Sequence, residues 1–260
     1  MKPGRRFFFA LAMVISATAP GLLWADMTWE EETTTSVILD GTAYPQEAAA
    51  TRVALKGDAA RIDDRDQAGV RYYNFFNETA IFYSQRNHSF LMVHFRDLLS
   101  QTQAQDQQVR QSLDERAAQA ERLVPASGRL LKAQVEGQRL RFALEGLPFR
   151  LEATGETAAL LGHPCRKYRG YNGETLYLET WLAEDIAPDQ AFRAYSQALA
   201  RLDRQSYQHQ LETQGFPLKT VFTYGPVQTV HEVKSFSAAP IPVTEFLLPD
   251  DAQLAVPGTE

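Results

Sequence analysis

The sequence predicts an α+β fold, in which one strongly bent antiparallel sheet, a half-barrel, carries two main helices packed on or across it. Two observations lead to this class. Short segments that alternate apolar and polar residues, separated by turn residues, recur along most of the chain and indicate strands. Two longer segments rich in Ala, Gln, Glu and Arg interrupt them and indicate helices. About eight or more strands in succession favour a sheet that curls towards a barrel.

The N-terminal 25 residues have the layout of a secretory signal peptide. Lys2, Arg5 and Arg6 form a basic start, an apolar core follows over residues 7–15, and Ala25 is the expected last residue before cleavage. The apolar run is too short and too interrupted to make a good membrane span. We therefore expect a periplasmic mature chain without a membrane span. An uncleaved N-terminal anchor is the alternative.

We expect a single domain over residues 26–250 and a loose tail over 251–260. The formal net charge is −6, and removal of the basic leader makes it more negative. An acidic surface repels phosphate backbones, so we expect no nucleic-acid partner. We expect no cofactor, since the chain has no phosphate-binding loop and no H-E-x-x-H motif. The acidic cluster Asp63, Asp64 and Asp66 lacks calcium-loop spacing, and we interpret it as a polar turn closed by Gly69.

In the first half of the chain the patterns predict six strands. Residues 28–40 are rich in Thr, Val and Ile and predict the first one. Residues 51–64 predict a hairpin around Gly57 and Asp58. Residues 70–95 predict three short strands. The last of them, "SFLMVHF", is apolar on both faces, which predicts that both faces are covered.

The second half mixes helices with further strands. Residues 97–123 predict a mostly solvated helix that Pro125 ends. Residues 188–214 predict a second helix, with Asp185 as a possible cap and Gly215 as its stop. The remaining alternating segments predict strands at 140–146, 148–162, 165–171, 174–183, 217–224, 228–236 and 243–249.

Cys165 is the only cysteine in the chain and cannot form an internal disulfide. It could be a nucleophile with His163 beside it, because Arg166 and Lys167 would favour the thiolate. However, cysteine is among the most buried residue types and packs as a small hydrophobe. We interpret Cys165 as a packing residue and predict that its thiol reacts poorly in the native protein.

Large apolar residues lie in the middle of several predicted strands. On the concave side of a bent sheet such residues would line an apolar ligand pocket. The alternative is an ordinary filled core. The candidates for the pocket are Phe82, Phe90, Met92, Leu178, Trp181 and Phe222.

The segment from residue 160 onward also resembles a known family. A glycine, a cysteine and Lys-Tyr are followed by a strand with an acidic residue and Trp, then by "GFPL", and then by a closing Val, Pro, Phe and Leu-Pro pattern. These residues are Gly162, Cys165, Lys167, Tyr168, Glu179, Trp181, Gly215, Pro217, Leu218, Val233, Pro242, Phe246 and Pro249. The pattern is similar to exported bacterial proteins of unknown function that look related to the LolA-like periplasmic half-barrels.

This resemblance implies a half-barrel closed by helices around an apolar cavity, and it carries over no catalytic residue. Relatives of that shape carry lipoprotein acyl chains or sense envelope lipids and misfolded proteins. The resulting hypothesis is a periplasmic, non-catalytic binding protein for an acyl chain, a lipid or a lipoprotein. An envelope interaction or stress-sensing module and an unrecognised enzyme that uses Cys165 and His163 are the alternatives.

Overall fold

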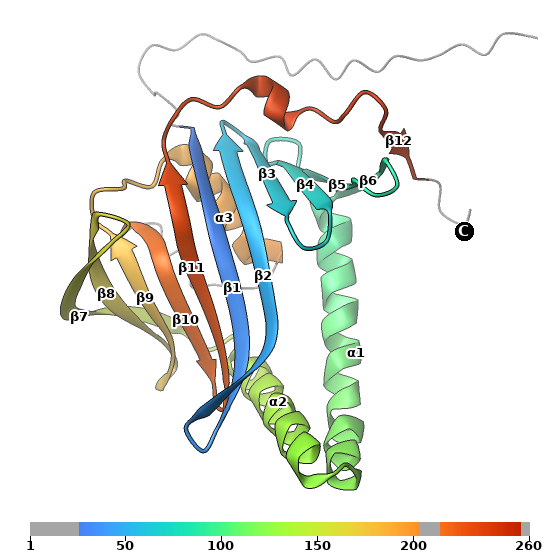
Figure 1. Ribbon diagram of the computed structural model, residues 1–260, viewed down its shortest axis with the longest axis vertical. Coiled ribbons are helices and arrows are strands. Elements are labelled where there is room, and N and C mark those ends of the chain that lie inside the picture. The colour runs from blue at the N-terminus through green and yellow to red at the C-terminus, as the bar shows by residue number, and fades with distance from the viewer. Residues whose placement is uncertain (1–25, 203–213, 256–260) are drawn as a thin grey trace, which may run out of the picture.

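One open sheet of 12 strands organises the molecule (Figure 1). The computed structural model describes residues 26–202 and 214–255. The strand order is β12-β6-β5-β4-β3-β2-β1-β11-β10-β9-β8-β7, and every neighbouring pair is antiparallel except β12 with β6. The sheet curves but does not close, because β12 and β7 form its two edges. With the three helices described below, this confirms the predicted α+β class.

The first half of the chain forms the strands that its turn residues predict. The hairpin at 51–64 and the three short strands after it are confirmed. Gly57, in the hairpin turn, has φ of 56°, a left-handed conformation that glycine adopts without steric cost. The bounds are β1 Met27–Leu39, β2 Thr42–Lys56, β3 Ala59–Asp64, β4 Gly69–Asn74, β5 Thr79–Ser84 and β6 Ser89–His94.

The second half completes the sheet on the other side of β1. Because β11 pairs with β1, the two halves of the chain join at the centre of one sheet (Figure 1). The expected strands at 148–162, 165–171, 174–183, 217–224 and 228–236 are all present. Their bounds are β7 Phe149–Leu160, β8 His163–Asn172, β9 Thr175–Ala183, β10 Phe216–Tyr224 and β11 Val227–Ser237.

Residues 26–202 and 214–255 contain three α-helices where the sequence predicts two. They are α1 Phe95–Arg122, α2 Pro125–Leu144 and α3 Gln190–Leu202. The strand expected at 140–146 is wrong, because residues up to Leu144 belong to α2. Pro125 both ends α1 and occupies the first turn of α2, where its missing N–H costs nothing. Helix α2 contacts the ends of β10 and β11 at Gly137, where an added Cβ would lie 2.4 Å from Val227 Cγ2.

Helices α2 and α3 pack on one face of the sheet, which we call the inner face; the opposite face is the outer face. Trp29 of β1 contacts Phe192 and Tyr195 of α3, and so identifies the inner face of β1. The cap of α3 is Asp189, whose carboxylate accepts from the Phe192 N–H at 2.7 Å, and not the expected Asp185. The part of the predicted helix at 203–213 lies outside the described residues.

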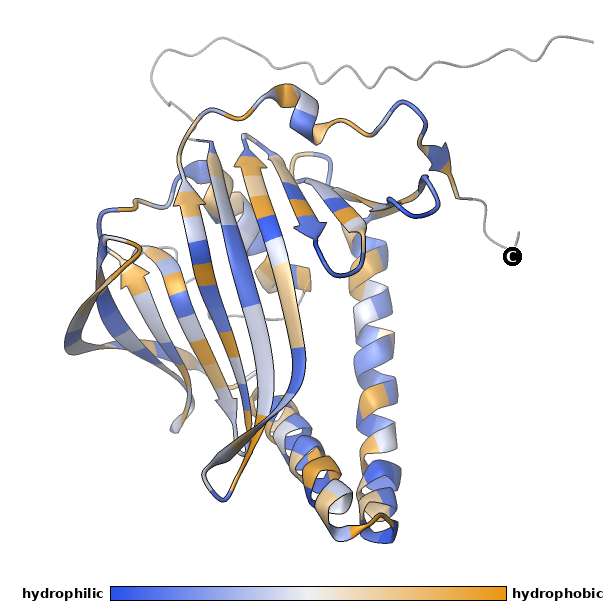
Figure 2. Cartoon of the chain, viewed as in Figure 1, coloured by the Kyte–Doolittle hydropathy of each residue, from blue (hydrophilic) through white to orange (hydrophobic). Residues whose placement is uncertain are grey.

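The upper core fills the inner face beneath α3. It joins apolar residues of β1, β2, β3 and β10 to the buried side of the helix. Phe216 is 1 % exposed, and its ring lies 5.3 Å from that of Trp29 and 5.1 Å from that of Phe192. Figure 2 shows that β1 itself is largely hydrophilic along its length, between more apolar neighbours. The apolar cover of the inner face is therefore interrupted along the central strand.

Two expectations about the edge of the sheet are corrected. Strand β6 is not covered on both faces, since Leu91 is 43 % and Met92 is 57 % exposed. Residues 243–249 form no strand; Val243–Phe246 is a 3₁₀ helix, because Pro240 and Pro242 precede it and cannot donate to a ladder. The segment continues over the outer face of β3, β4 and β5. We call residues 241–255 the strap.

The described part of the tail contains a short strand. Strand β12, Gln253–Leu254, pairs with β6, and the N–H groups of Gln253 and Ala255 donate to His88 O and Phe90 O at 2.8 Å. Residues 256–260 lie outside the described residues, as does the expected signal peptide at 1–25. Among the helices of residues 26–202 and 214–255, none combines the length and the apolar content that a bilayer crossing requires.

Candidate functional site

A row of polar side chains crosses the inner face at one level on five consecutive strands. Strand register places Tyr168 beside Thr180, Thr180 beside Thr220, Thr220 beside His231, and His231 beside Thr33. We call these residues, together with Glu31 on the same face of β1, the polar row. Directly cross-strand residues on one face lie close enough to interact.

The β8–β10 end of the polar row is buried and internally satisfied. Thr180 is fully buried, and its hydroxyl lies 2.9 Å from that of Thr220 and donates to Lys219 O at 3.1 Å. The inner-face residues on either side of these threonines are apolar, Leu178 and Leu182 on β9 and Leu218 and Phe222 on β10. Hydrogen bonding offsets the cost of burying the two hydroxyl groups here.

The β11–β1 end of the polar row is partly open to solvent. His231 Nδ1 lies 2.8 Å from Glu31 Oε1 and 3.2 Å from Thr33 Oγ1. The two paired side chains are 36 % and 25 % exposed. Next along the same strands, Thr35 and Thr229 share a hydrogen bond of 3.1 Å. Solvent or a ligand can therefore reach an imidazole that a carboxylate holds in place.

Phe222 fixes the imidazole from the β10 side. Its ring lies 5.5 Å from that of His231 at an interplanar angle of 85°, an edge-to-face contact. Because a carboxylate only accepts hydrogen bonds, Nδ1 donates to Glu31 and the remaining ring nitrogen, Nε2, is left to interact with other groups. Chemically, the site offers one oriented hydrogen-bonding atom next to apolar walls.

The six residues expected to line a pocket are not brought together. Leu178 and Phe222 share one buried cluster that flanks the polar row. Phe82 packs against the upper core on the inner face, and Trp181 lies on the face of β9 opposite Leu178. Phe90 and Met92 share the outer face of β6, where Phe90 joins a cluster beneath the strap and Met92 is exposed. Ligand binding by these residues stays a prediction.

Cys165 is a packing residue, as interpreted from the sequence. It is 1 % exposed, and its Sγ–H donates to the carbonyl of His163 rather than to the imidazole. That imidazole lies 3.0 Å from Asp185 Oδ2 instead. Burial raises the pKa of the thiol, which disfavours the reactive thiolate.

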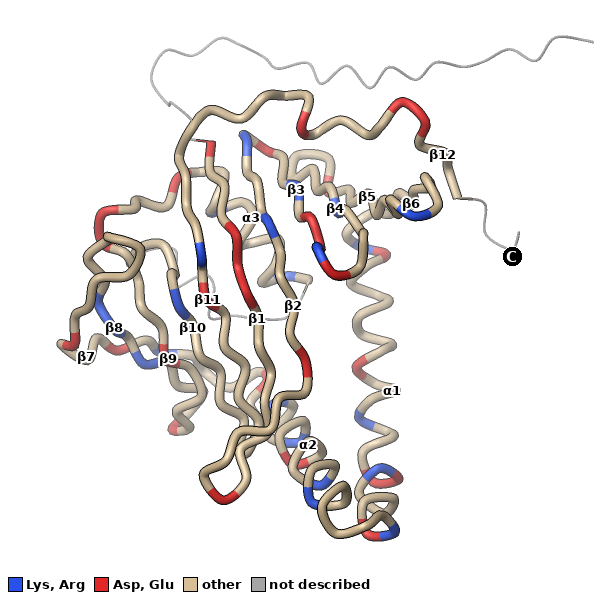
Figure 3. The backbone as a smooth tube through the Cα atoms, in the orientation of Figure 1, with Lys and Arg blue, Asp and Glu red and all other residues tan. Residues whose placement is uncertain are grey.

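The outer face carries paired charges and no comparable polar row among the described residues. Figure 3 shows the acidic stretch of β1 beside basic segments of β2 and β11. Lys234 Nζ lies 3.2 Å from Glu32, and Lys167 Nζ lies 2.9 Å from Glu179. The hydrogen bond from Lys167 holds the pKa of Glu179 below its usual range. In residues 26–202 and 214–255, no set of three or more His, Cys, Asp or Glu side chains could hold a metal ion.

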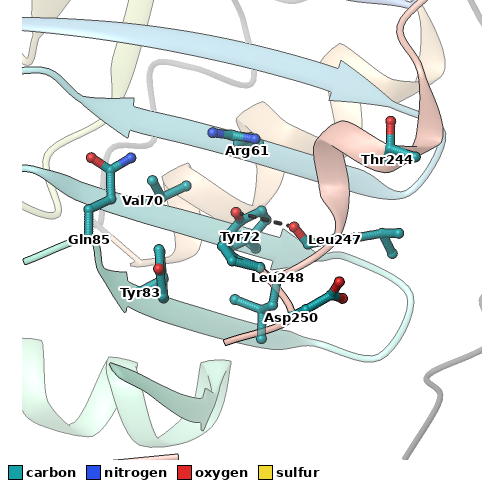
Figure 4. A pocket seen from close by; sticks show the side chains of 10 residues that line it. Arg61, Val70, Tyr72, Tyr83, Gln85, Thr244, Leu247, Leu248 and Asp250 are labelled. Atoms are coloured by element: carbon teal, nitrogen blue, oxygen red, sulfur yellow. Dashed lines mark hydrogen bonds between the residues drawn. The ribbon is translucent and has the colours of Figure 1, made fainter. Parts of the chain in front are cut away.

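The strap and the outer face of β3–β5 line an open pocket of about 350 Å³ (Figure 4). Arg61 holds the strap in place, because its guanidinium pairs with Asp63 at 2.7 Å and donates to Glu245 O at 2.8 Å. Tyr72 and Tyr83 form part of the wall, and burial raises the pKa of Tyr72. The acidic turn predicted at 63–66 contributes here through Asp63, while Asp66 accepts from the Ala50 N–H at 3.0 Å.

The residues of the polar row were missed by sequence reasoning because they are far apart in the chain. One signal was present. The inner-face positions in the middle of β1 are Glu31, Thr33 and Thr35, whereas a strand at the centre of a sheet normally directs apolar residues towards the core. Only the pairing of β1 with β11 shows which side chain lies beside them.

Comparison with known proteins gives one family match. Residues 136–252 match the family described as "Domain of unknown function (DUF4412)". The matched segment runs from α2 to the strap and includes the polar row except for its β1 members. A comparison with curated proteins returned no match.

Similar folds occur among solved structures. An uncharacterized conserved protein from Thermus thermophilus is 10% identical with a TM-score of 0.41, and the match covers 87% of this chain and 90% of that one. PNGF-II is 12% identical with a TM-score of 0.34, over 87% of this chain but only 31% of PNGF-II. The LolA superfamily protein NE2245 from Nitrosomonas europaea is 7% identical with a TM-score of 0.32, over 86% and 90%.

The family match accords with the resemblance of the sequence to a family of unknown function. With TM-scores of 0.41 and below, none of the structural likenesses specifies an activity. The polar row and the apolar residues of the inner face therefore provide the basis for a function.

Proposed function

We propose that this chain is an exported, non-catalytic binding protein that holds an acyl chain, of a lipid or of a lipoprotein, against the inner face of its sheet. One observation carries the proposal: on the inner face, apolar residues flank a polar row that is partly exposed to solvent at its Glu31–His231 end. Ligand sites of this kind are mostly apolar, with a few well-placed polar groups. Each ligand methylene buried there would contribute about 0.8 kcal/mol.

The first experiment is native mass spectrometry of the protein purified from its own cell envelope, followed by organic extraction. A co-purifying lipid or acylated species is the expected result and would identify the ligand class. The same preparation, delipidated, should then bind the apolar dye N-phenyl-1-naphthylamine more strongly than before. A protein that carries no lipid and whose dye binding does not change on delipidation would contradict the proposal.

A matched pair of variants locates the ligand. Thr229→Trp adds bulk on the inner face beside the Glu31–His231 pair, and should abolish lipid co-purification and dye binding. Thr34→Trp is the control, because Thr34 is exposed on the outer side of the neighbouring strand β1. Equal loss in both variants, or in neither, would place the ligand elsewhere.

The enzyme alternative is tested at Cys165. A thiol reagent such as 5,5′-dithiobis(2-nitrobenzoate) should label Cys165 slowly in the native protein and rapidly in denaturant, because the thiol is buried. Cys165→Ala should lower stability and leave lipid binding intact. Rapid native labelling, or loss of binding in a folded Cys165→Ala variant, would favour chemistry at the thiol instead.

A further inference from the structure

We infer that the loop between α1 and α2 docks onto an anionic bilayer surface, where Leu123 and Val124 insert among the lipids and neighbouring cations contact the headgroups. This docking surface is separate from the polar row, and it does not require the proposed function. Its starting point is a pair of apolar side chains that the fold leaves in contact with water. Leu123 is 40 % exposed and Val124 is 68 % exposed.

The helical hairpin does not use these two side chains for its own stability. Val124 is the N-cap residue of α2 but makes no side-chain hydrogen bond there, although Ser, Thr, Asp or Asn at this position would stabilise the helix. Leu123 precedes the cap, where an apolar residue often packs against the fourth residue of the helix. That residue is Gly128, which has no side chain, and an added Cβ would lie 2.4 Å from Ala120 O. Both apolar side chains therefore remain exposed at the tip of the hairpin.

The loop lies at one end of the molecule, with the β1–β2 turn near it (Figure 1). Arg129 of α2 pairs with Asp40 of that turn, which fixes the two tips relative to each other. Figure 2 shows the α1–α2 loop as an apolar segment at the bottom of the molecule. Tyr44, near the start of β2, is 41 % exposed, and its amphipathic ring suits the headgroup layer. A bilayer that approaches this end therefore meets the apolar loop first.

Cations surround the loop on an otherwise acidic chain. Arg122, Arg129 and Lys132 are exposed and lie within about 12 Å of helix rise from it. Among the described residues, neither Arg122 nor Lys132 pairs with a carboxylate. The nearby carboxylates of Glu121 and Asp40 are outnumbered. Helix α2 as a whole has four Arg or Lys residues and one Glu, a charge of +3, whereas the chain has −6 (Figure 3). Anionic headgroups attract such side chains, so the local charge favours an anionic surface over a neutral one.

Exposure of an apolar side chain alone does not make such a surface, as Phe76 shows. Phe76 is 82 % exposed in the β4–β5 turn. Arg201 reaches this turn but is already paired with Glu78 at 2.7 Å. The Phe95 N–H donates to Glu78 O at 2.9 Å, so the turn lies at the opposite end of α1, about 40 Å along the helix from the loop. Phe76 therefore provides an internal control.

The test uses the full mature chain and vesicles of phosphatidylcholine, with or without an equal part of phosphatidylglycerol. Val124→Cys is labelled with nitrobenzoxadiazole under native conditions, where the buried thiol of Cys165 is spared. The emission should increase and shift to the blue when anionic vesicles are added, and high salt should reverse the change. Neutral vesicles should give a much smaller change. The same label on Phe76→Cys should not respond.

Co-sedimentation of unlabelled variants with the vesicles then assigns the contact. Val124→Ser supplies a preferred N-cap, so it should melt no lower than the wild type and yet bind about tenfold more weakly. Lys132→Gln should bind anionic vesicles about fivefold more weakly. Phe76→Ser is the matched control and should bind like the wild type.

Three results would each overturn docking through this loop. They are a wild type that does not bind anionic vesicles, equal binding to neutral and anionic vesicles, and a folded Val124→Ser variant that binds like the wild type. None of them bears on the proposed function, which rests on the inner face.

Discussion

The upper core and the strap cover opposite faces of the same strands, but different forces hold them. Beneath α3 the contact is aromatic and buried, with ring centroids 5.0 Å to 6.2 Å apart around Phe216 and Trp29. The strap is held mainly by polar contacts, which include those of Arg61, the Arg52–Glu245 ion pair at 3.1 Å and the backbone hydrogen bonds of β12 to β6, and by one small apolar cluster that includes Leu248.

The upper core and the strap are therefore expected to unfold in different ways. Burial of apolar area is non-directional and shared by many side chains, so the upper core should unfold only with the whole sheet. Hydrogen bonds and partly exposed ion pairs are each worth little, so the strap should open locally while the rest of the sheet stays intact.

Phe216→Ala should cost about 3–5 kcal/mol of the free energy of unfolding, because it leaves a cavity in the best-packed part of the upper core. Urea titration followed by circular dichroism measures this cost. Phe76→Ala is the control, since Phe76 is 82 % exposed and should change stability little. If the two variants were equally stable, the packing of the upper core would not determine the free energy of unfolding.

Gly137→Ala should cost about 1–3 kcal/mol by overpacking α2 against the sheet. The new Cβ would lie 2.4 Å from Val227 Cγ2 and 3.0 Å from Tyr224 O, and the backbone oxygen cannot move aside cheaply. Thermal melts give the measurement. Gly69→Ala is the matched change, because no atom lies within 4 Å of its added Cβ. A neutral Gly137→Ala would mean that α2 is more loosely docked than its contacts indicate.

Arg61→Ala should change the free energy of unfolding by only about 1 kcal/mol, yet release the strap. Hydrogen exchange should lose protection at the Gln253 and Ala255 amides, which donate to β6. Arg65→Ala serves for comparison, because Arg65 pairs with Glu30 of β1 on the same face rather than with a strap residue. Protection that survives in Arg61→Ala would show that the strap does not depend on this clamp.

Glu179→Gln should produce the smallest effect, visible only as a change in pH dependence. The pKa of Glu179 is lower in the folded chain than its ordinary value of 4.5, because Lys167 donates a hydrogen bond to its carboxylate. The stability it contributes is therefore present above about pH 4.5 and is lost as the pH falls through the lowered pKa.

Urea midpoints measured between neutral pH and about pH 3 should fall less steeply in Glu179→Gln than in the wild type. Glu174→Gln is the reference, since Glu174 is almost fully exposed at the turn before β9. Identical acid profiles for all three proteins would mean that solvent screens the Lys167–Glu179 pair completely.

Local patterns were enough to predict most of the sheet. Hairpins were recognisable from turn residues such as Gly57 and from alternation over a few positions, because the two strands of a hairpin are neighbours in the chain. The burial of Cys165 also followed from its residue type. Local reasoning failed at α2, where "LRFALEG" fits a short strand as well as the end of a helix.

The strap and the edge strand show a second kind of failure. "VTEFLLP" alternates like a strand, but the prolines before it and the lack of a free edge beside β11 divert it across the outer face. The sequence of β6 is apolar on both faces, which predicts that both are covered. In the structure, however, β6 lies next to the edge of the sheet, and its outer neighbour β12 is only two residues long. Neither the path of residues 243–249 nor the exposure of β6 can be predicted from the local sequence, since both depend on which strands are neighbours in the sheet.

Local sequence patterns thus predicted most of the strands and two of the three described helices, because these depend on contacts over a few residues. Only the tertiary structure decided the candidate site. The pairing of β1 with β11 brings Glu31 and Thr33 beside His231 across nearly the whole chain. Register over such a distance is fixed by the packing of the entire sheet, so no local pattern could reveal which histidine the carboxylate would hold.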